Sequence, residues 1–231
     1  MVSAISFVPA SLPPLPEPLA HALRVAAGGG AKRERTQAQL VMAAVQVFST
    51  RGVEAATMQE VAQVAGVTTG TVYNHFSTKT DLLERVAQVL ADSFCRAIND
   101  SYAHITDGAQ RMAIGQRRYV RLAAENPGWA MLLLDVLLQA PAVLESIQQY
   151  PLNDLRIGVR QRKFKVPSEA AALDVINGVC IQAMRCVALG QAPANHDVAA
   201  AAMVLRALGM APAEALEVAR RPLPELVQPQ G

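Results

Sequence analysis

The sequence predicts an all-α fold, and three observations support this. Apolar residues recur three and four positions apart through most of residues 37–209, the spacing that gathers them on one face of an α-helix. Residues 79–210 lack the apolar–polar alternation typical of strands and contain few clusters of turn residues. Of the 231 residues, 52% are hydrophobic and 17% charged, so the chain can bury a substantial helical core.

Residues 1–31 differ from the rest of the chain. Prolines interrupt regular structure between residues 9 and 18, and Gly28, Gly29 and Gly30 form a flexible joint. We expect a mostly disordered extension with a possible short helix over residues 19–27. No basic segment precedes an apolar one, so it does not have the form of a signal peptide.

The first strong helix is predicted over residues 37–52, and a second, short one follows Thr57. Thr57 and Glu60 have the spacing of a capping box, which satisfies the free amides at a helix start. Gly66 follows the last apolar residue of this helix and can adopt the positive φ that ends it. Thr68 then fits the N-cap position of a third helix. The segment therefore has the layout of a helix-turn-helix.

The outer face of that third helix is unusual for a surface that only confers solubility. Val72 and Phe76 are expected to face the core, which leaves hydroxyl, amide and aromatic groups toward solvent. Such groups can meet phosphates and base edges. The outward residues are Thr69, Gly70, Thr71, Tyr73, Asn74 and His75.

At these residues the sequence resembles the tetracycline-repressor (TetR) family of bacterial regulators. The resemblance covers residues 33–85, and rests on Thr57, the run AGVTTGTVYNHF at residues 65–76, and STKTDLL directly after it. It implies an all-α protein with an N-terminal three-helix DNA-binding domain and a C-terminal helical ligand-binding and dimerisation domain. The boundaries we expect are 1–31 for the extension, 32–78 for the helix-turn-helix domain, 79–210 for the effector-binding and dimerisation domain, and 211–231 for a C-terminal tail.

The resemblance also implies roles for individual residues. Thr69 and Gly70 lie where base contacts are made, and Asn74 can bond adenine or reach a phosphate. The short side chain of Thr69 shifts sequence reading toward Asn74 and DNA shape. A dimer would place two recognition helices in successive major grooves of a pseudo-palindromic operator. The positions expected to contact phosphate are Thr57, Thr68, Thr71, Tyr73, His75 and Lys79.

Helical periodicity continues after the motif. Thr78 and Asp81 are expected to cap a long helix that starts at residue 79. A basic cluster at residues 156–165 is most simply a solvated helix end, with an acidic-ligand or DNA role as the alternative. The further helices expected are 109–124, 128–139, 141–163 with an interruption near Tyr150 and Pro151, 168–189, 196–209 and a short one at 213–220.

By position, helices 168–189 and 196–209 are the candidates for a homodimer interface, as the family resemblance implies. The same resemblance places a small-molecule effector in the C-terminal helices. With 4% aromatic residues, its pocket should be mostly aliphatic, which indicates a lipophilic effector. The candidate pocket residues are Phe94, Tyr102, Tyr119, Trp129, Met131, Leu134, Phe164 and Met184.

Charge and cysteine content constrain this hypothesis. The net charge is +2, and residues 32–90 hold six basic and five acidic side chains, so non-specific DNA affinity should be modest. Arg33 and Arg35 could follow the DNA backbone or minor groove, or simply begin a solvated helix. Cys95, Cys180 and Cys186 have no metal-binding spacing and are expected to be free thiols in a reducing cytoplasm. No apolar run is long enough to suggest a membrane span.

The sequence is less consistent with other classes of function than with a repressor. The four histidines form no metal or triad pattern, and no glycine-rich phosphate loop or paired carboxylates stand out, so we expect neither an enzyme nor a cofactor or metal site. A ligand-responsive activator and a helical small-molecule carrier are the alternatives. A nucleoid-type DNA-coating protein would not need so large an apolar core.

Overall fold

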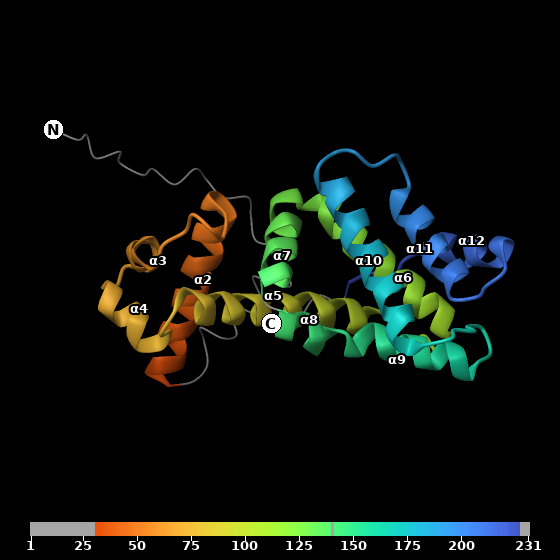
Figure 1. The fold of residues 1–231 in the computed structure, drawn as a ribbon, viewed down its shortest axis with the longest axis horizontal. Helices are drawn as coiled ribbons and strands as arrows, with labels where there is room; N and C mark the ends of the chain where they lie inside the picture. The colour runs from red at the N-terminus through yellow and green to blue at the C-terminus, as the bar shows by residue number, and fades with distance from the viewer. Residues whose placement is uncertain (1–30, 140, 227–231) are drawn as a thin grey trace.

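The computed structural model describes residues 31–139 and 141–226, and within them every regular element is an α-helix (Figure 1). The extension expected over residues 1–31, including a helix at 19–27, lies outside the described residues except for Ala31. The helices are α2 (Lys32–Arg51), α3 (Met58–Ala65), α4 (Thr69–His75), α5 (Lys79–Ser101), α6 (Gly108–Glu125), α7 (Pro127–Gln139), α8 (Pro141–Ile147), α9 (Gln149–Arg160), α10 (Glu169–Ala188), α11 (His196–Ala207) and α12 (Pro212–Arg220).

Helices α2, α3 and α4 form a small unit at one end of the molecule (Figure 1). α2 supplies Leu40, Ala44 and Phe48, which are at most 2% exposed and lie at helical spacing on its inner face. α2 begins at Lys32, five residues before the predicted start, so Arg33 and Arg35 belong to its exposed first turns. The solvated helix start is thus the conformation found for this basic segment.

Helix α5 connects the two ends of the molecule (Figure 1). The predicted cap is present: Thr78 accepts a hydrogen bond from the Asp81 amide, and the Asp81 carboxylate accepts one from the Thr78 amide. The helix then runs for 23 residues to Ser101, and Tyr102 is its C-cap. Its buried face carries Leu82, Val86 and Leu90 in the first half and Phe94 and Ile98 in the second.

One apolar core extends along α5 from the N-terminal unit into the C-terminal helices. It contains Val72 of α4 and Phe48 of α2, and it continues without interruption to Leu134 of α7 and Met184 of α10. α2 also contacts α7 directly. A second core holds α6, α9, α10, α11 and α12 together.

The C-terminal end of the chain differs from the expectation of a tail over residues 211–231. The short helix predicted at 213–220 is present as α12, and Ala215, Val218 and Ala219 are at most 3% exposed against α11 and α6. Pro212 at its first turn favours the helix because the missing amide hydrogen is not needed there. This segment therefore packs as part of the helical body.

A buried ion pair joins α6 to α11. Asp197, in the first turn of α11, accepts hydrogen bonds of 3.0 Å from Nε of both Arg117 and Arg121. The side chains of Arg117 and Asp197 are 6% and 10% exposed. Burial alone would raise the pKa of the Asp197 carboxyl, but the two arginines outweigh it and hold that pKa below its ordinary value.

The depressed pKa predicts an acid-sensitive contribution to stability. The folded protein binds the Asp197 proton less tightly than the unfolded chain, so this contribution is present above pH 4 and is lost as pH falls through the folded pKa. Replacing Asp197 with Ala leaves Arg117 buried without its partner and should cost about 3 kcal/mol at pH 7. Urea unfolding of both proteins at several pH values should show the difference narrowing below about pH 4. A difference that stays constant down to pH 2.5 would contradict this assignment.

Candidate functional site

The helix-turn-helix is held by local hydrogen bonds that the sequence predicted. The Thr57 hydroxyl accepts from the Glu60 amide at 3.2 Å, and the Glu60 carboxylate accepts from the Thr57 amide at 2.9 Å, so the capping box is confirmed. Gly66 has φ +67°, a left-handed conformation that non-glycine residues adopt at a cost. The Thr68 side chain accepts from the Thr71 amide and caps α4.

The recognition helix α4 is anchored from beneath. Val72 is 0% exposed and Phe76 is 4% exposed, as predicted for the core face. The Gln39 side-chain amide of α2 donates a 2.7 Å hydrogen bond to the Ala65 carbonyl at the turn. These contacts fix the orientation of α4 on the surface of the unit.

The residues predicted to contact DNA are all exposed or partly exposed, and we call them the motif surface: Thr57, Thr68, Thr69, Gly70, Thr71, Tyr73, Asn74, His75 and Lys79. Tyr73 is 52% exposed, whereas tyrosine side chains are on average partly buried. Gly70 and Asn74 are exposed, while Thr69 and His75 are partly covered. The arrangement presents hydrogen-bonding groups and an aromatic ring side by side.

Four of the predicted phosphate contacts already have partners within the protein. Lys79 Nζ donates a 2.8 Å hydrogen bond to the Glu54 carbonyl, which ties the start of α5 to the loop after α2. An ammonium group has three donors, so two are available for phosphate oxygens. The Thr57 hydroxyl bonds the Glu60 carboxylate at 2.9 Å, and the hydroxyls of Thr68 and Thr71 bond each other at 2.9 Å. A phosphate contact by these hydroxyls would replace or share those bonds.

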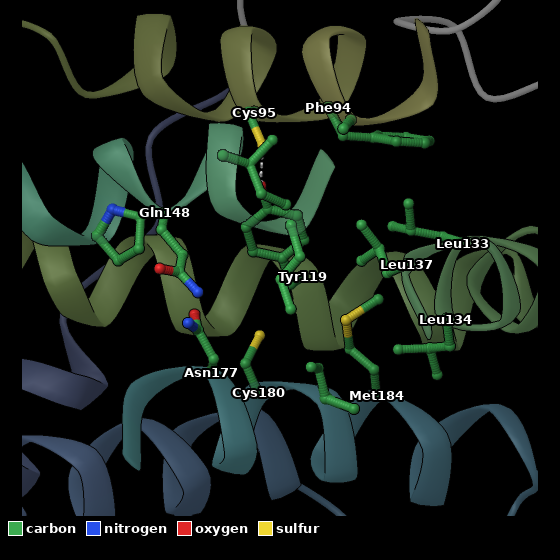
Figure 2. Close-up of a pocket in the computed structure, with 15 residues that line it drawn as sticks. Phe94, Cys95, Tyr119, Leu133, Leu134, Leu137, Gln148, Asn177, Cys180 and Met184 are labelled. Carbon is green, nitrogen blue, oxygen red and sulfur yellow. Dashed lines mark hydrogen bonds between the residues drawn. The ribbon is translucent and has the colours of Figure 1, made fainter. Parts of the chain in front are cut away.

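A mostly apolar cavity lies between α5, α6, α7 and α10, with α8 and the start of α9 closing one side (Figure 2). Its volume is about 80 Å³. Four of the eight residues predicted for the pocket line it, namely Phe94, Tyr119, Leu134 and Met184. The other apolar lining residues include Leu133 and Leu137 of α7 and Ile181 of α10.

A second cavity of about 70 Å³ adjoins the first. The two share the lining residues Cys95, Tyr119, Pro151, Asn177 and Cys180. The second is more polar, since Tyr102, Gln116 and Asp154 also line it. Tyr102 is thus a fifth predicted residue that reaches this region.

The other three predicted pocket residues lie elsewhere. Trp129 is 2% exposed in the apolar core that extends along α5, and Met131 packs on that core from a partly buried position. Phe164 belongs to the second core, and its ring lies so close to Gly158 that a Cβ there would overlap it. Helical spacing could not separate core-filling side chains from cavity-lining ones.

Uncharged polar groups surround the junction of the two cavities. The Cys95 thiol and the Tyr119 hydroxyl are 2.8 Å apart and form a hydrogen bond (Figure 2). Burial raises the pKa of the Cys180 thiol to about 12 and raises that of Tyr119 as well, so both groups are neutral at physiological pH. Figure 2 shows the amides of Gln148 and Asn177 facing one another beside them.

A buried charge cluster closes the far end of the second cavity. Arg111 Nε donates to Asp154 Oδ1 at 2.6 Å, and the Tyr102 hydroxyl donates to Asp154 Oδ2 at 3.0 Å. The Arg111 guanidinium also lies 4.7 Å from the centre of the Tyr102 ring. Because Tyr102 caps the C-terminus of α5, this cluster fixes that end of α5 to α6 and α9.

The polar lining residues were missed from the sequence, although a signal for them exists. Gln116 lies four residues from both Met112 and Val120, at a position where an apolar side chain would continue the buried stripe of α6. Asn177 follows the buried Ile176 in an apolar helix. A polar side chain at a core position is informative because burial without a partner is costly. Among the described residues, no three His, Cys, Asp or Glu side chains are grouped as a metal site would require.

The motif surface and the separate internal cavity define a class of protein: a DNA-binding transcriptional regulator with a ligand-binding domain. The chain belongs to the tetracycline-repressor (TetR) family. The family model for "Bacterial regulatory proteins, tetR family" matches residues 40–86. The model for "Tetracyclin repressor-like, C-terminal domain" matches residues 107–221, so both parts of the protein are covered.

Individual relatives agree with this assignment. ArpR of Pseudomonas putida, a probable helix-turn-helix transcriptional regulator, is 29% identical over 174 residues, covering 74% of this chain and 75% of ArpR. The solved structure of RolR with its ligand resorcinol is 29% identical, with a TM-score of 0.72 over 85% of this chain and 98% of RolR. RolR without ligand is 30% identical, with a TM-score of 0.69 over 82% of this chain and 100% of RolR.

Proposed function

We propose that the protein is a dimeric repressor that binds a pseudo-palindromic operator through the motif surface and is released by a small lipophilic effector. The observation that supports it most is the continuity of the apolar core from α4 to the cavity wall. A cytoplasmic location follows from access to DNA in a bacterium.

The coupling we propose runs through α5 and α7. Leu133 and Leu134 of the cavity wall belong to the same core as Val72 and Phe48 beneath the recognition helix. A close-packed core transmits a displacement because it has little free volume to absorb it. A ligand between α5, α7 and α10 would therefore favour a conformer in which α2 and α4 have moved. It can do so only to the extent that it binds this conformer more tightly.

The effector is proposed to be compact and mainly apolar. The 80 Å³ cavity is lined largely by leucine, isoleucine, methionine and phenylalanine side chains. RolR binds resorcinol, a small ring compound. FadR of Bacillus subtilis, solved with stearoyl-CoA, is only 18% identical and supports the shared fold alone.

A homodimer through α10 and α11 is supported by what those helices expose. α10 has a mean hydropathy of 1.3 over its most apolar stretch, yet only 22% of that stretch is buried in the single chain. Its length and composition alone would also suit a membrane span, but it packs along α6, α7 and α11. The exposed stripe includes Val175 and Gly178 on α10 and Met203 on α11. Small residues in this stripe allow close approach of a partner helix.

Activation is the second candidate mode. FasR of Mycolicibacterium smegmatis, a transcriptional activator, is 36% identical, but the match covers only 37% of this chain. Transcription from the bound promoter, measured with and without the protein, distinguishes the two modes. Reduced transcription supports repression, and increased transcription supports activation.

The DNA contacts can be tested with Tyr73→Ala and Lys79→Ala. Each should weaken binding to the operator by about tenfold, because each removes a contact worth on the order of 1 kcal/mol or more. Lys79→Ala should also lower the slope of log affinity against log salt by about 1, the effect of one phosphate contact. Fluorescence anisotropy at several salt concentrations, with the protein's upstream intergenic DNA and with random DNA, measures both.

The matched control for these variants is Arg160→Ala, which removes an exposed positive charge at the other end of the molecule. It should leave affinity and salt slope unchanged. Equal losses in all three variants would indicate a general charge effect and contradict the proposed surface.

The dimer interface can be tested with Gly178→Glu. A Cβ at Gly178 meets no atom within 4 Å in the single chain, so the variant should fold, but a carboxylate there would be buried against a partner helix. Sedimentation velocity should show a dissociation constant raised by about 100-fold, or about 2.7 kcal/mol. The control Val159→Glu, on the exposed face of α9, should remain as dimeric as the wild type. An unchanged dimer in Gly178→Glu would move the interface elsewhere.

A further inference from the structure

One buried polar atom beside the cavities has no partner in the described part of the chain. Gln116 is 5% exposed and lines the second cavity, and its Oε1 accepts no hydrogen bond. A buried acceptor without a donor costs about 1–3 kcal/mol, so its presence requires an explanation.

The hydrogen bond made by the nitrogen of the same amide shows which of its two polar atoms is unpaired. Gln116 Nε2 donates a 3.1 Å hydrogen bond to the Ile176 carbonyl of α10. Rotating the amide would set two oxygens against each other, so the nitrogen belongs on Ile176. The unpaired group is therefore an acceptor, and the molecule that satisfies it must donate an O–H or N–H.

The charges around the cavities restrict that molecule further. None of the residues that line either cavity is a lysine, arginine or histidine. The one lining carboxylate, Asp154, already accepts hydrogen bonds from Arg111 and Tyr102. A carboxylate or phosphate ligand would thus be buried beside Asp154 without a counter-charge, which is strongly unfavourable. The ligand should be uncharged.

The volume of the two cavities limits the length of the ligand. The two adjoining cavities measure about 80 Å³ and 70 Å³. A cavity of about 150 Å³ accommodates one benzene molecule. One ring with a single small polar substituent matches this space, whereas a long acyl chain does not.

We infer that the effector is a small uncharged ring compound, either an aromatic or alicyclic alcohol or an aromatic amine. Its apolar ring occupies the space where the two cavities meet, beside Tyr119 and Cys180, and its O–H or N–H donates to Gln116 Oε1. This inference rests on the proposed function, because it names the ligand class of the effector cavity. It makes Gln116 the residue that distinguishes a hydroxylated ring from the bare hydrocarbon.

Titration calorimetry on the full-length chain without DNA tests this directly. Phenol, toluene and benzoate are suitable probes, since they share a ring and differ in donor capacity and charge. The wild type should bind phenol at least tenfold more tightly than toluene, and should bind benzoate more weakly than either. This comparison needs no variant, so it does not depend on how a substitution folds.

The variant Gln116→Met replaces the amide with an apolar side chain of similar length. It should weaken phenol binding by about tenfold and leave toluene binding unchanged or stronger. Gln63→Met, at an exposed position of α3 away from both cavities, is the matched control and should behave as the wild type. The unfolding midpoint of each variant should be measured alongside.

Several results would overturn the inference. For the wild type, these are equal binding of phenol and toluene, tightest binding of benzoate, or no binding of any probe. For Gln116→Met, the contradicting result is unchanged phenol binding, which would indicate that water satisfies Oε1 of Gln116 in the wild type. None of these would affect operator binding, which is measured separately. Release of the operator by an unrelated compound, with no phenol binding, would leave the repressor proposal standing and remove only this ligand class.

Discussion

The arrangement of this protein depends on one physical constraint, the continuous packing of apolar side chains along α5. Leu82, Val86 and Leu90 pack within the same core as α2 and α4, and Phe94 lines the cavity on the same helix. If polar residues or solvent separated the helix-turn-helix unit from the cavity, a displacement at the cavity would not reach the helix-turn-helix unit. Instead, the residues under the recognition helix and those of the cavity wall share one core, in which a change of volume at one place requires adjustment at another.

Hydrogen bonds hold α5 at both ends of this core. At the N-terminus, Lys79 bonds the Glu54 carbonyl, and at the C-terminus, Tyr102 bonds Asp154 of α9. Isolated bonds of this kind contribute modestly to stability, but they fix where the helix ends. The cluster of Tyr102, Asp154 and Arg111 adjoins the cavity that contains Gln116, so polar groups of the ligand site lie next to the anchor of the connecting helix. In the proposed mechanism, ligand recognition and conformational control would therefore use neighbouring side chains.

The sequence predicted some parts of this protein much better than others. The caps at Thr57, Thr68 and Thr78 and the turn at Gly66 were predictable because the hydrogen bonds that form them lie within four residues of sequence. The helices after the motif were predictable from the spacing of apolar residues. The packing of α12 against α6 was not predictable, because it depends on contacts between residues more than ninety positions apart in the sequence. The cavity was only partly predictable: Phe94 and Trp129 have similar patterns, yet one lines the cavity and the other fills the core. Gln116 and Asn177 could have been noticed as polar residues at apolar positions.

The most direct test of the proposed coupling is the distance between the two α4 helices of the dimer. A spin label on a non-natural amino acid at position 77, an exposed position just after α4 and outside the motif surface, reports it without altering Cys95, Cys180 or Cys186. With operator bound, the distance distribution should be narrow and match successive major grooves, about 34–36 Å between half-site centres. With saturating phenol and no DNA, the account predicts a shifted distribution outside that spacing. An unchanged distribution under conditions in which phenol releases the operator would contradict it, because release would then not arise from movement of the recognition helices.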